Sequence, residues 1–423
     1  MNINEILAGV DCACGKHHTC SIESVYIESG AAKRLGELCK DCARILIVAD
    51  ENTYAAGGAR VEKALAGKEI TRVVFDGKVV LIPDENAIAR VNASLHGVDM
   101  IIALGSGVIQ DLCKYCSHFS GISYIDVATA PSMDGYASDG AAMILHGMKE
   151  TVKAGLPRSI VCDVDILKNA PLDMIQAGYG DIIGKYSALC DWRLANIVTG
   201  EYLCDYIYDT TAAMIEKTRT LAGGLMERRE ESIAALMEAL VVVGIMMSFA
   251  GSSRPASGSE HHLSHFFEIT GILNNEPYFP HGIDVAYATV ITSSLRERLA
   301  AAEFPAQGFS LSRDNYLAKM KEIYGRIADG CVALQDKAGS YATDRTPIYR
   351  AHEAEIKGIF KEVPTAWEIA DMLRLVGLDM QEFYAAYGDK KIADAISYAK
   401  DLKDRYSVLW MYYDLMGEAH VAG

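Results

Sequence analysis

Residues 100–111 read MIIALGSGVIQD, and this stretch decides the fold class of the chain. Its first part, Met100–Leu104, is a continuous apolar run, which predicts a strand buried on both faces. Two glycines follow, and Val108–Phe119 then has the length and period of a helix. A turn of this kind lets backbone N–H groups approach a pyrophosphate, although the third glycine of a full GxGxxG motif is missing.

The same alternation of strand and helix extends over the first part of the chain. Further strands are predicted at Ile45–Asp50, Thr71–Phe75, Ile122–Asp126 and Ser159–Asp163, and further helices at Tyr54–Gly67 and Asn86–His96. This pattern predicts a Rossmann-like α/β domain with a mainly parallel sheet over residues 1–169.

The sequence changes character after Pro171, where long segments rich in Ala, Leu, Met and Glu replace the β-branched runs. They predict an all-helical second domain over residues 170–423. Its expected helices are Thr210–Arg229, Glu231–Ala250, Asp314–Leu334, Ala366–Val376 and Ala393–Met416. A nucleotide-binding domain joined to a helical one suggests a ligand site that uses both, an inference from architecture alone.

Length and charge limit the function classes. The chain has 423 residues, enough for two domains, and 50% of them are hydrophobic, which excludes disorder as its main state. With 40 Lys and Arg against 56 Asp and Glu the net charge is −16, so nucleic acid is not an expected partner. An anionic ligand would therefore need a local site of positive potential, built from backbone amides, lysine or a metal.

Cysteine usage and apolar runs indicate the compartment. Eleven cysteines cannot all pair, and the first residues, MNINEILAGVDCACGKHH, do not have the pattern of a signal peptide, so a reduced, cytoplasmic protein is expected. The most apolar stretch, Ala239–Ala250, is too short to cross a bilayer. We expect it to be a buried core helix, with no membrane span.

Two segments beside the glycine turn are candidates for ligand binding. Asp50 ends the first predicted strand, where a carboxylate can accept ribose hydroxyls; the alternative is that Asp50 only caps the next helix. Thr129–Ser138 is a run of hydroxyls and turn formers after another strand. Ligands of open α/β sheets bind at such strand ends, but an ordinary polar loop has the same composition.

A histidine cluster is the strongest chemical signal. His261 and His265 are four residues apart, so a helix would place them on one face, and His281 follows 16 residues after His265. Together with Asp181, they suggest an Asp/His/His site with an open position, typical of a catalytic divalent metal. Solvated histidines on a helix face are the alternative. A zinc-peptidase HExxH motif is excluded because His262 follows His261.

The cysteine pairs are weaker candidates for metal sites. Cys39-x-x-Cys42 and Cys113-x-x-Cys116 are too far apart in the sequence for a zinc ribbon. The segment Cys12–Cys20, with three cysteines and two histidines, is denser. It is interpreted either as a second metal site or as a flexible N-terminal segment.

In this order, these motifs resemble the glycerol-1-phosphate dehydrogenase family, within the superfamily of iron-containing alcohol dehydrogenases and dehydroquinate synthases. Gly105–Asp111 is similar to the family's GGGxxxD, with Ser106 in place of the middle glycine, and Thr129–Ser138 to its TAxSxDGxxS. Gly178–Lys185 resembles GxGDxxxK and Gly258–His265 resembles GSEHxxSH. The Cys-rich start and the helical C-terminal extension depart from the pattern.

The resemblance implies a dehydroquinate synthase-like fold and a role for each matching residue. It implies that the metal ligands are Asp181, His261 and His281. It implies that the substrate is contacted by Asp134, Asp181 and His265, of which Asp134 and His265 are catalytic. It implies an NAD(P) site lined by Asp50, Gly105, Ser106, Gly107, Val108, Asp111, Thr129, Ser132 and Ser138. For the substrate phosphate we expect Lys149, with Arg254 as a second candidate; surface charge is the alternative for both.

The expected activity is reduction of dihydroxyacetone phosphate to sn-glycerol 1-phosphate by NAD(P)H, and the reverse reaction. The expected metal is zinc or nickel, with iron as a further option. Asp50 disfavours the 2′-phosphate of NADP, but a nearby Lys or Arg can compensate. A homo-oligomer is also expected. The alternatives are a polyol dehydrogenase on unphosphorylated glycerol, a sugar-phosphate cyclase, disfavoured by Asp181 where a cyclase carries Glu, and a metal or redox sensor using the N-terminal cysteines.

Overall fold

The computed structural model describes residues 3–146 and 148–419, and of residues 148 and 149 it describes the backbone only. The chain divides into two compact units. The α/β unit consists of Met1–Gly178 and Glu216–Ser252, and the helical unit of Tyr179–Ile215 and Ser253–Gly423. The first unit therefore includes a segment that comes well after residue 170 in the sequence.

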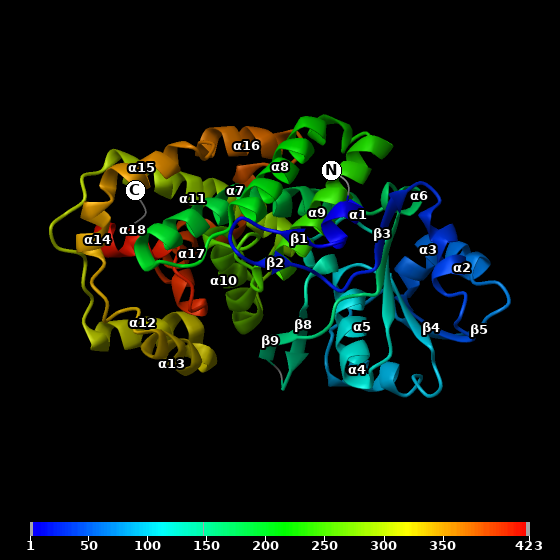
Figure 1. Cartoon of the computed structure of the whole chain (residues 1–423). Coiled ribbons are helices and arrows are strands. Elements are labelled where there is room, and N and C mark those ends of the chain that lie inside the picture. Colours follow the sequence, from blue (N-terminus) through cyan, green and yellow to red (C-terminus); the bar gives the residue numbers. More distant parts are fainter. Residues whose placement is uncertain (1–2, 147, 420–423) are drawn as a thin grey trace. The chain divides into compact units, whose positions relative to one another are not determined.

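A six-stranded, fully parallel sheet forms the centre of the α/β unit (Figure 1). Its strands, in spatial order, are β3 (Ser24–Glu28), β10 (Ser159–Asp163), β7 (Tyr124–Ala128), β6 (Met100–Gly105), β4 (Arg44–Asp50) and β5 (Glu69–Phe75). The five predicted strands are all present, so the α/β expectation is confirmed. The sixth, β3, was not predicted, because its sequence SVYIE mixes polar and apolar residues at the sheet edge.

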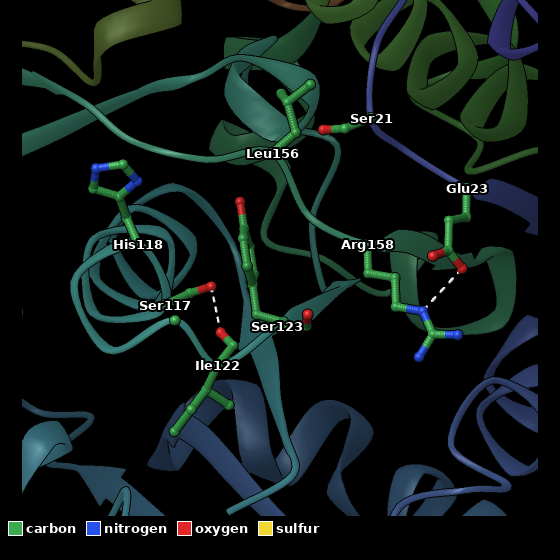
Figure 2. A pocket seen from close by; sticks show the side chains of 10 residues that line it. Ser21, Glu23, Ser117, His118, Ile122, Ser123, Leu156 and Arg158 are labelled. Atoms are coloured by element: carbon green, nitrogen blue, oxygen red, sulfur yellow. Dashed lines mark hydrogen bonds and ion pairs between the residues drawn. The ribbon is translucent and has the colours of Figure 1, made fainter.

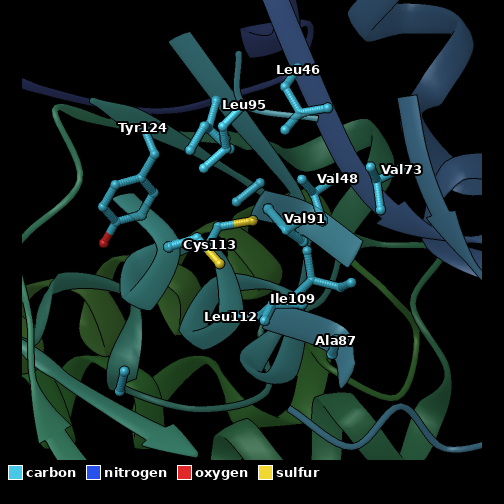
Figure 3. Packing of buried hydrophobic residues seen from close by; sticks show 14 of the residues in the cluster. Leu46, Val48, Val73, Ala87, Val91, Leu95, Ile109, Leu112, Cys113 and Tyr124 are labelled. Atoms are coloured by element: carbon cyan, nitrogen blue, oxygen red, sulfur yellow. The ribbon is translucent and has the colours of Figure 1, made fainter. Parts of the chain in front are cut away.

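Alternate residues of the strands build a core on each face of this sheet. Leu46 and Val48 point to the face covered by α4 (Glu85–Asn92) and α5 (Gly107–Ser120), in the cluster shown in Figure 3. Their neighbours Ile45, Ile47 and Ala49 point to the face covered by α2 (Leu35–Leu38) and α3 (Glu51–Ala64). Because both faces are buried at β4 and β6, these two strands read as nearly continuous apolar runs in the sequence.

The two Cys-x-x-Cys pairs belong to these cores. Cys113 and Cys116 pack in the first cluster, and Cys39 and Cys42 in the second. Burial raises the pKa of Cys39 and of Cys116 to about 12. Thiols held in the protonated form by burial pack as small apolar side chains, so both pairs are structural.

The most apolar segment is helix α9 (Glu230–Ala250) of the α/β unit. Within the described part of the chain it is the one helix long and apolar enough to cross a bilayer, yet 78% of its apolar window is buried in the protein. This burial is what was predicted for a core helix. At Gly244 an added Cβ would lie 2.8 Å from the backbone oxygen of Asp134, so the absence of a side chain lets the Thr129–Ser138 loop rest directly on α9.

The helical unit contains no strand among its described residues, which confirms the all-helical expectation. Two other helices of the second half are shared between the units: α7 (Leu172–Thr199) and α8 (Asp205–Leu221). The rest of the helical unit is built from α10 (Ser259–Asn274), α11 (His281–Ala301), α12 (Arg313–Tyr324), α13 (Ala328–Ala338), α14 (Thr346–Ala351), α15 (Glu353–Lys361), α16 (Ala366–Arg374), α17 (Met380–Tyr398) and α18 (Val408–Met416).

Two of the long helices predicted from composition are interrupted. The helix expected over Asp314–Leu334 splits into α12 and α13 around Gly325, whose φ of 48° is left-handed. The helix expected over Ala393–Met416 ends at Tyr398, because Lys400 and Asp401 turn into the interior of the unit. There the Lys400 ammonium hydrogen-bonds the carboxylate of Asp401 and the hydroxyl of Tyr341.

Candidate active site

Three of the predicted cofactor residues, Asp50, Gly105 and Thr129, lie at the carboxyl edge of the sheet. The chain leaves β4 toward β5 on one side and returns to β6 on the other, so the strand order reverses between β4 and β6. Asp50 ends β4 and Gly105 ends β6, and Thr129, just after β7, donates its N–H to the Gly105 oxygen at 3.0 Å. Such a reversal point is where open α/β sheets bind ligands.

The glycine turn has the predicted strand-to-helix form. An added Cβ on Gly105 would lie 2.5 Å from Cβ of Ile109, so the tight turn itself requires that glycine. An added Cβ on Gly107 would lie 3.6 Å from Met133, an ordinary contact, so packing does not require the second one. Gly107 is the first residue of α5, and there a bare backbone is useful for the approach of an anion to the helix N-terminus.

Asp50 makes the interactions of a helix cap. Its Oδ1 accepts the N–H groups of Asn52 at 2.8 Å and Thr53 at 2.9 Å, and the Thr53 hydroxyl accepts the N–H of Asp50 in return. The capping interpretation therefore holds for α3. Binding of a ribose by the same carboxylate stays a prediction.

The other candidates of this unit have structural contacts of their own. Asp111 accepts hydrogen bonds from Lys114 Nζ and from the N–H of Ala142 in the hairpin of β8 (Gly140–Leu145) and β9 (Met148–Lys153). Ser138 donates to the oxygen of Gly135, and Ser132 lies in the same loop. Ser106 and Val108 flank the first residue of α5. The side chain of Lys149 lies outside the described residues, so its role with a phosphate stays a prediction.

A cavity of about 530 Å³ lies at the opposite, amino edge of the sheet (Figure 2). It is lined by the end of α5 and the residues just before β3, β7 and β10. Its Arg158 is engaged by Glu23 at 2.9 Å. Because ligands of open α/β sheets bind at the carboxyl edge, we do not include this cavity in the candidate site.

Asp181, His261 and His281 come together in the helical unit. One ligand atom of each lies within 4.8 Å of those of the other two, and Asp181 Oδ1 is 3.6 Å from His261 Nε2. Asp181 is on α7, His261 is in the first turn of α10, and His281 is the first residue of α11. Asp181 and His261 are buried. A clustered carboxylate and two imidazoles fit a divalent metal.

Glycines on α7 bring the helices close enough for this cluster. An added Cβ on Gly180 would lie 2.3 Å from the backbone oxygen of Gly282, and one on Gly184 would lie 2.5 Å from Val285. The first turn of α11 therefore packs directly on the α7 backbone. Gly180 and Gly184 precede and follow Asp181 on α7 and carry no side chain. His281 can therefore come close to the Asp181 carboxylate.

Hydrogen bonds orient both imidazoles toward the cluster. Nδ1 of His261 is 2.7 Å from a carboxylate oxygen of Glu260, which accepts only, so Nδ1 carries the proton and Nε2 presents its lone pair. The Ser264 hydroxyl is 3.2 Å from Nδ1 of His281 and donates to the His281 oxygen, so it can accept the Nδ1 proton. His261 thus offers Nε2 to a metal, and His281 does so when Ser264 accepts its Nδ1 proton.

Lys185 fixes the third ligand. Its ammonium is fully buried and donates to Asp181 Oδ1 at 2.5 Å, one helical turn along α7.

Burial, reinforced by the Lys185 charge, lowers the pKa of His261 well below its ordinary value. His261 is therefore neutral at physiological pH, which is the form that binds a metal.

His265, like His281, is partly exposed. Its ring centroid lies 5.4 Å from that of His281 and 6.3 Å from that of His261. A histidine beside a metal cluster but with access to solvent can hydrogen-bond a substrate hydroxyl and exchange its proton with water. Asp134, the second predicted catalytic residue, belongs to the α/β unit, and its role stays a prediction.

Some residues around the cluster were not singled out from the sequence. Glu260 and Lys185 lie within the quoted motifs. Their positions in the sequence do not reveal that Glu260 orients His261 or that Lys185 holds Asp181. A basic residue four positions after Asp181 was the available signal for Lys185. Arg254, the second phosphate candidate, is instead buried and forms a bidentate ion pair with Glu201.

We expect the Glu260→Gln substitution to weaken metal binding by about 10- to 100-fold, as loss of a charged partner of a metal-bound imidazole typically does. The amide can still accept from the N–H of Gly258, so the fold should persist. Titration of metal-free protein with zinc measures the change. The exposed Glu303, replaced in the same way, serves as control. Equal zinc affinity in the two variants would show that Glu260 does not support the ligand.

The chain is similar to known proteins along most of its length. A family model described as iron-containing alcohol dehydrogenase matches residues 26–171. The glycerol-1-phosphate dehydrogenase (NAD(P)+) of Geobacillus thermodenitrificans is 33% identical over 299 residues, which cover 68% of this chain and 73% of the relative. That of Bacillus licheniformis is 27% identical over 409 residues, which cover 94% of this chain and 90% of the relative.

Solved structures show the same fold. An iron-containing alcohol dehydrogenase from Thermococcus thioreducens superposes with a TM-score of 0.58 at 16% identity, covering 95% of this chain and 94% of that one. A glycerol dehydrogenase from Schizosaccharomyces pombe gives a TM-score of 0.53 at 16% identity, covering 86% of this chain and 91% of that one. At this identity the likeness concerns the fold alone.

Proposed function

Because this chain belongs to the glycerol-1-phosphate dehydrogenase family, we propose that it interconverts dihydroxyacetone phosphate and sn-glycerol 1-phosphate with NAD(P)H and a divalent metal. The observation that carries the proposal is the convergence of Asp181, His261 and His281, with both imidazoles oriented by hydrogen bonds. When bound, the metal supplies Lewis-acid polarisation of the carbonyl oxygen, and the reduced nicotinamide supplies the hydride.

The residues of the helical unit have separate roles in this reaction. Glu260 and Ser264 hold the two imidazoles in the tautomer that exposes Nε2. Lys185 keeps the Asp181 carboxylate in place. His265 delivers a proton to the oxygen on carbon 2 as the alcohol forms, and takes it back in the oxidation. One carboxylate and two imidazoles suit zinc or nickel, and iron is a further option.

The cofactor is proposed to lie at the reversal point of the sheet. The amides of Gly105–Val108 and the start of α5 face the position expected for its pyrophosphate. The other residues proposed to line the cofactor site are Asp50, Asp111, Thr129, Ser132 and Ser138. Because the protein carries a net charge of −16, the N–H groups at the start of α5 are the feature that would let it hold an anionic cofactor.

The direct test is the oxidation of NADH and of NADPH by dihydroxyacetone phosphate in the presence of metal-loaded protein, with chiral analysis of the product. We expect sn-glycerol 1-phosphate. No turnover with zinc-, nickel- or iron-loaded protein would reject the proposal. Formation of the opposite enantiomer would reject the proposed stereochemistry, but the protein would still be a dehydrogenase.

Lys149→Ala separates this activity from that of a polyol dehydrogenase. If Lys149 binds the phosphate, kcat/KM for sn-glycerol 1-phosphate should fall by about 10- to 100-fold, which corresponds to one charge-assisted hydrogen bond, while kcat/KM for glycerol stays the same. Lys153→Ala, on the same strand β9, is the matched control. A higher kcat/KM for glycerol than for its phosphate in the native protein would favour the polyol dehydrogenase.

A further inference from the structure

A two-stranded hairpin near the N-terminus brings three metal-binding side chains together within the α/β unit. Its strands are β1 (Val10–Asp11) and β2 (His17–His18), paired antiparallel with Val10 opposite His18. The N–H of Cys12 donates to the oxygen of Lys16, and the N–H of Gly15 to the oxygen of Cys12. Gly15 has a φ of 85°, in the left-handed region that favours glycine. The turn that carries Cys14 is therefore closed by its own backbone.

The ligand atoms of Cys12, Cys14 and His18 lie within 4.8 Å of one another. Sγ of Cys14 is 3.4 Å from Nε2 of His18. In tetrahedral zinc sites with bonds of about 2.0 to 2.3 Å, the ligand atoms are roughly 3.3 to 3.8 Å apart, so small adjustments would let these three side chains coordinate one zinc ion.

The side chain of His18 is held in place by packing against helix α9. Its ring is 2% exposed and stacks on Phe249 of α9, with centroids 5.3 Å apart and an interplanar angle of 13°. The adjacent His17 points to the other face of the strand, where it is largely exposed and pairs with Asp11 at 2.7 Å. Of two consecutive histidines, the one beside the cysteines is thus the one fixed by packing.

We propose that Cys12, Cys14 and His18 bind a zinc ion as three of its four ligands, in addition to the metal expected at Asp181. Two thiolates and one imidazole favour zinc over the hard cations that oxygen ligands select. Binding releases the two thiol protons and leaves a neutral zinc–dithiolate group. A hairpin with two residues in each strand is too small to be stable alone, so the ion would also fix this segment against α9.

The first experiment counts metal in two variants that separate the two centres. The His261→Ala chain, purified from zinc-supplemented cells, should retain one zinc per chain, measured by mass spectrometry of the metal. Cys12→Ser combined with Cys14→Ser in the same background should reduce it to the background level. In an otherwise native chain the double substitution should remove one equivalent and leave dehydrogenase activity per folded molecule unchanged.

The second experiment reads the ligands directly, in a chain that keeps all its cysteines. Cobalt(II) in the His261→Ala protein should give the thiolate-to-cobalt charge-transfer band, which an Asp/His/His site cannot produce. Cys20→Ser, a nearby cysteine outside the cluster, is the matched control and should keep the band. Absence of both the band and the zinc would overturn the proposal. So would a band that disappears with Cys20→Ser but persists in the Cys12→Ser, Cys14→Ser protein.

Discussion

The His261→Ala protein is expected to lose metal at the catalytic cluster and dehydrogenase activity together. His261 contributes one of three ligands, and its Nε2 is 3.6 Å from the Asp181 carboxylate. With that imidazole gone, Asp181 retains its ion pair with Lys185 and His281 is left as the single nitrogen ligand. Activity should fall to the level of metal-stripped native protein, and supplementing the assay with metal should not restore it.

The matched control for this prediction is His265→Ala, one turn further along α10. It should bind metal like the native protein, but with kcat lowered by about 10²- to 10⁴-fold, the usual contribution of a general acid or base. Metal content and kcat are measured on the same preparations, with unfolding temperature as a check on the fold. Activity that survives in His261→Ala protein whose Asp181 cluster holds no metal would defeat the assignment of the cluster.

The second large effect is expected for stability, at Asp191 on α7. This carboxylate is fully buried and accepts hydrogen bonds from the N–H of Ser259, at the start of α10, and the N–H of Val408, at the start of α18. It also pairs with the buried guanidinium of Arg296 on α11 at 2.9 Å. One side chain thus joins four helices of the helical unit. Its partner Ser259 lies two residues before the metal ligand His261.

Asp191→Ala is therefore expected to lower the free energy of unfolding by about 3 to 5 kcal/mol, because it leaves a buried cation without its partner. Denaturant unfolding measures the loss. Asp336→Ala, which breaks the exposed pair with Arg313, should cost less than about 1 kcal/mol. If both variants lose the same amount, Asp191 is not the organising residue that its contacts indicate.

A double substitution refines this test. Replacing Asp191 by Leu and Arg296 by Met removes both charges, and buried pairs replaced in this way often lose little stability. Here recovery should be partial, because the N–H groups of Ser259 and Val408 would still lack an acceptor, at about 1 to 3 kcal/mol each. Full recovery would show that the cost of Asp191→Ala comes from the charge alone.

The sequence predicted the parts of this protein that depend on local patterns. The buried strand at Met100–Leu104 and the helix after it follow from unbroken apolar character and period, and the shared face of His261 and His265 follows from their spacing. The pairing of β3 with β10 could not be predicted in this way, because it joins residues more than 130 positions apart and leaves no local signal. The same holds for Gly180, whose importance appears only when Gly282 is seen packed against it.

The candidate site shows a similar division. Asp181 and His281 were candidate ligands by residue type, and the resemblance to a family gave them their roles, since nothing in their spacing places them together. The support from Glu260, Ser264 and Lys185 depends on rotamers and helix packing, which a pattern of residue types does not encode. Cytoplasmic location and assembly into a homo-oligomer stay predictions.

The α/β unit is assembled from two separate lengths of chain, and this affects how it can form during synthesis. Its sheet is complete once β10 has been made, but α9, which packs on the loop after Asp134, ends at Ala250. Synthesis therefore passes through α7 and much of α8 before the last piece of the first unit leaves the ribosome. A nascent chain stopped after the sheet would expose the apolar surface that α9 covers, and exposed surface of this kind makes a folding intermediate prone to aggregate.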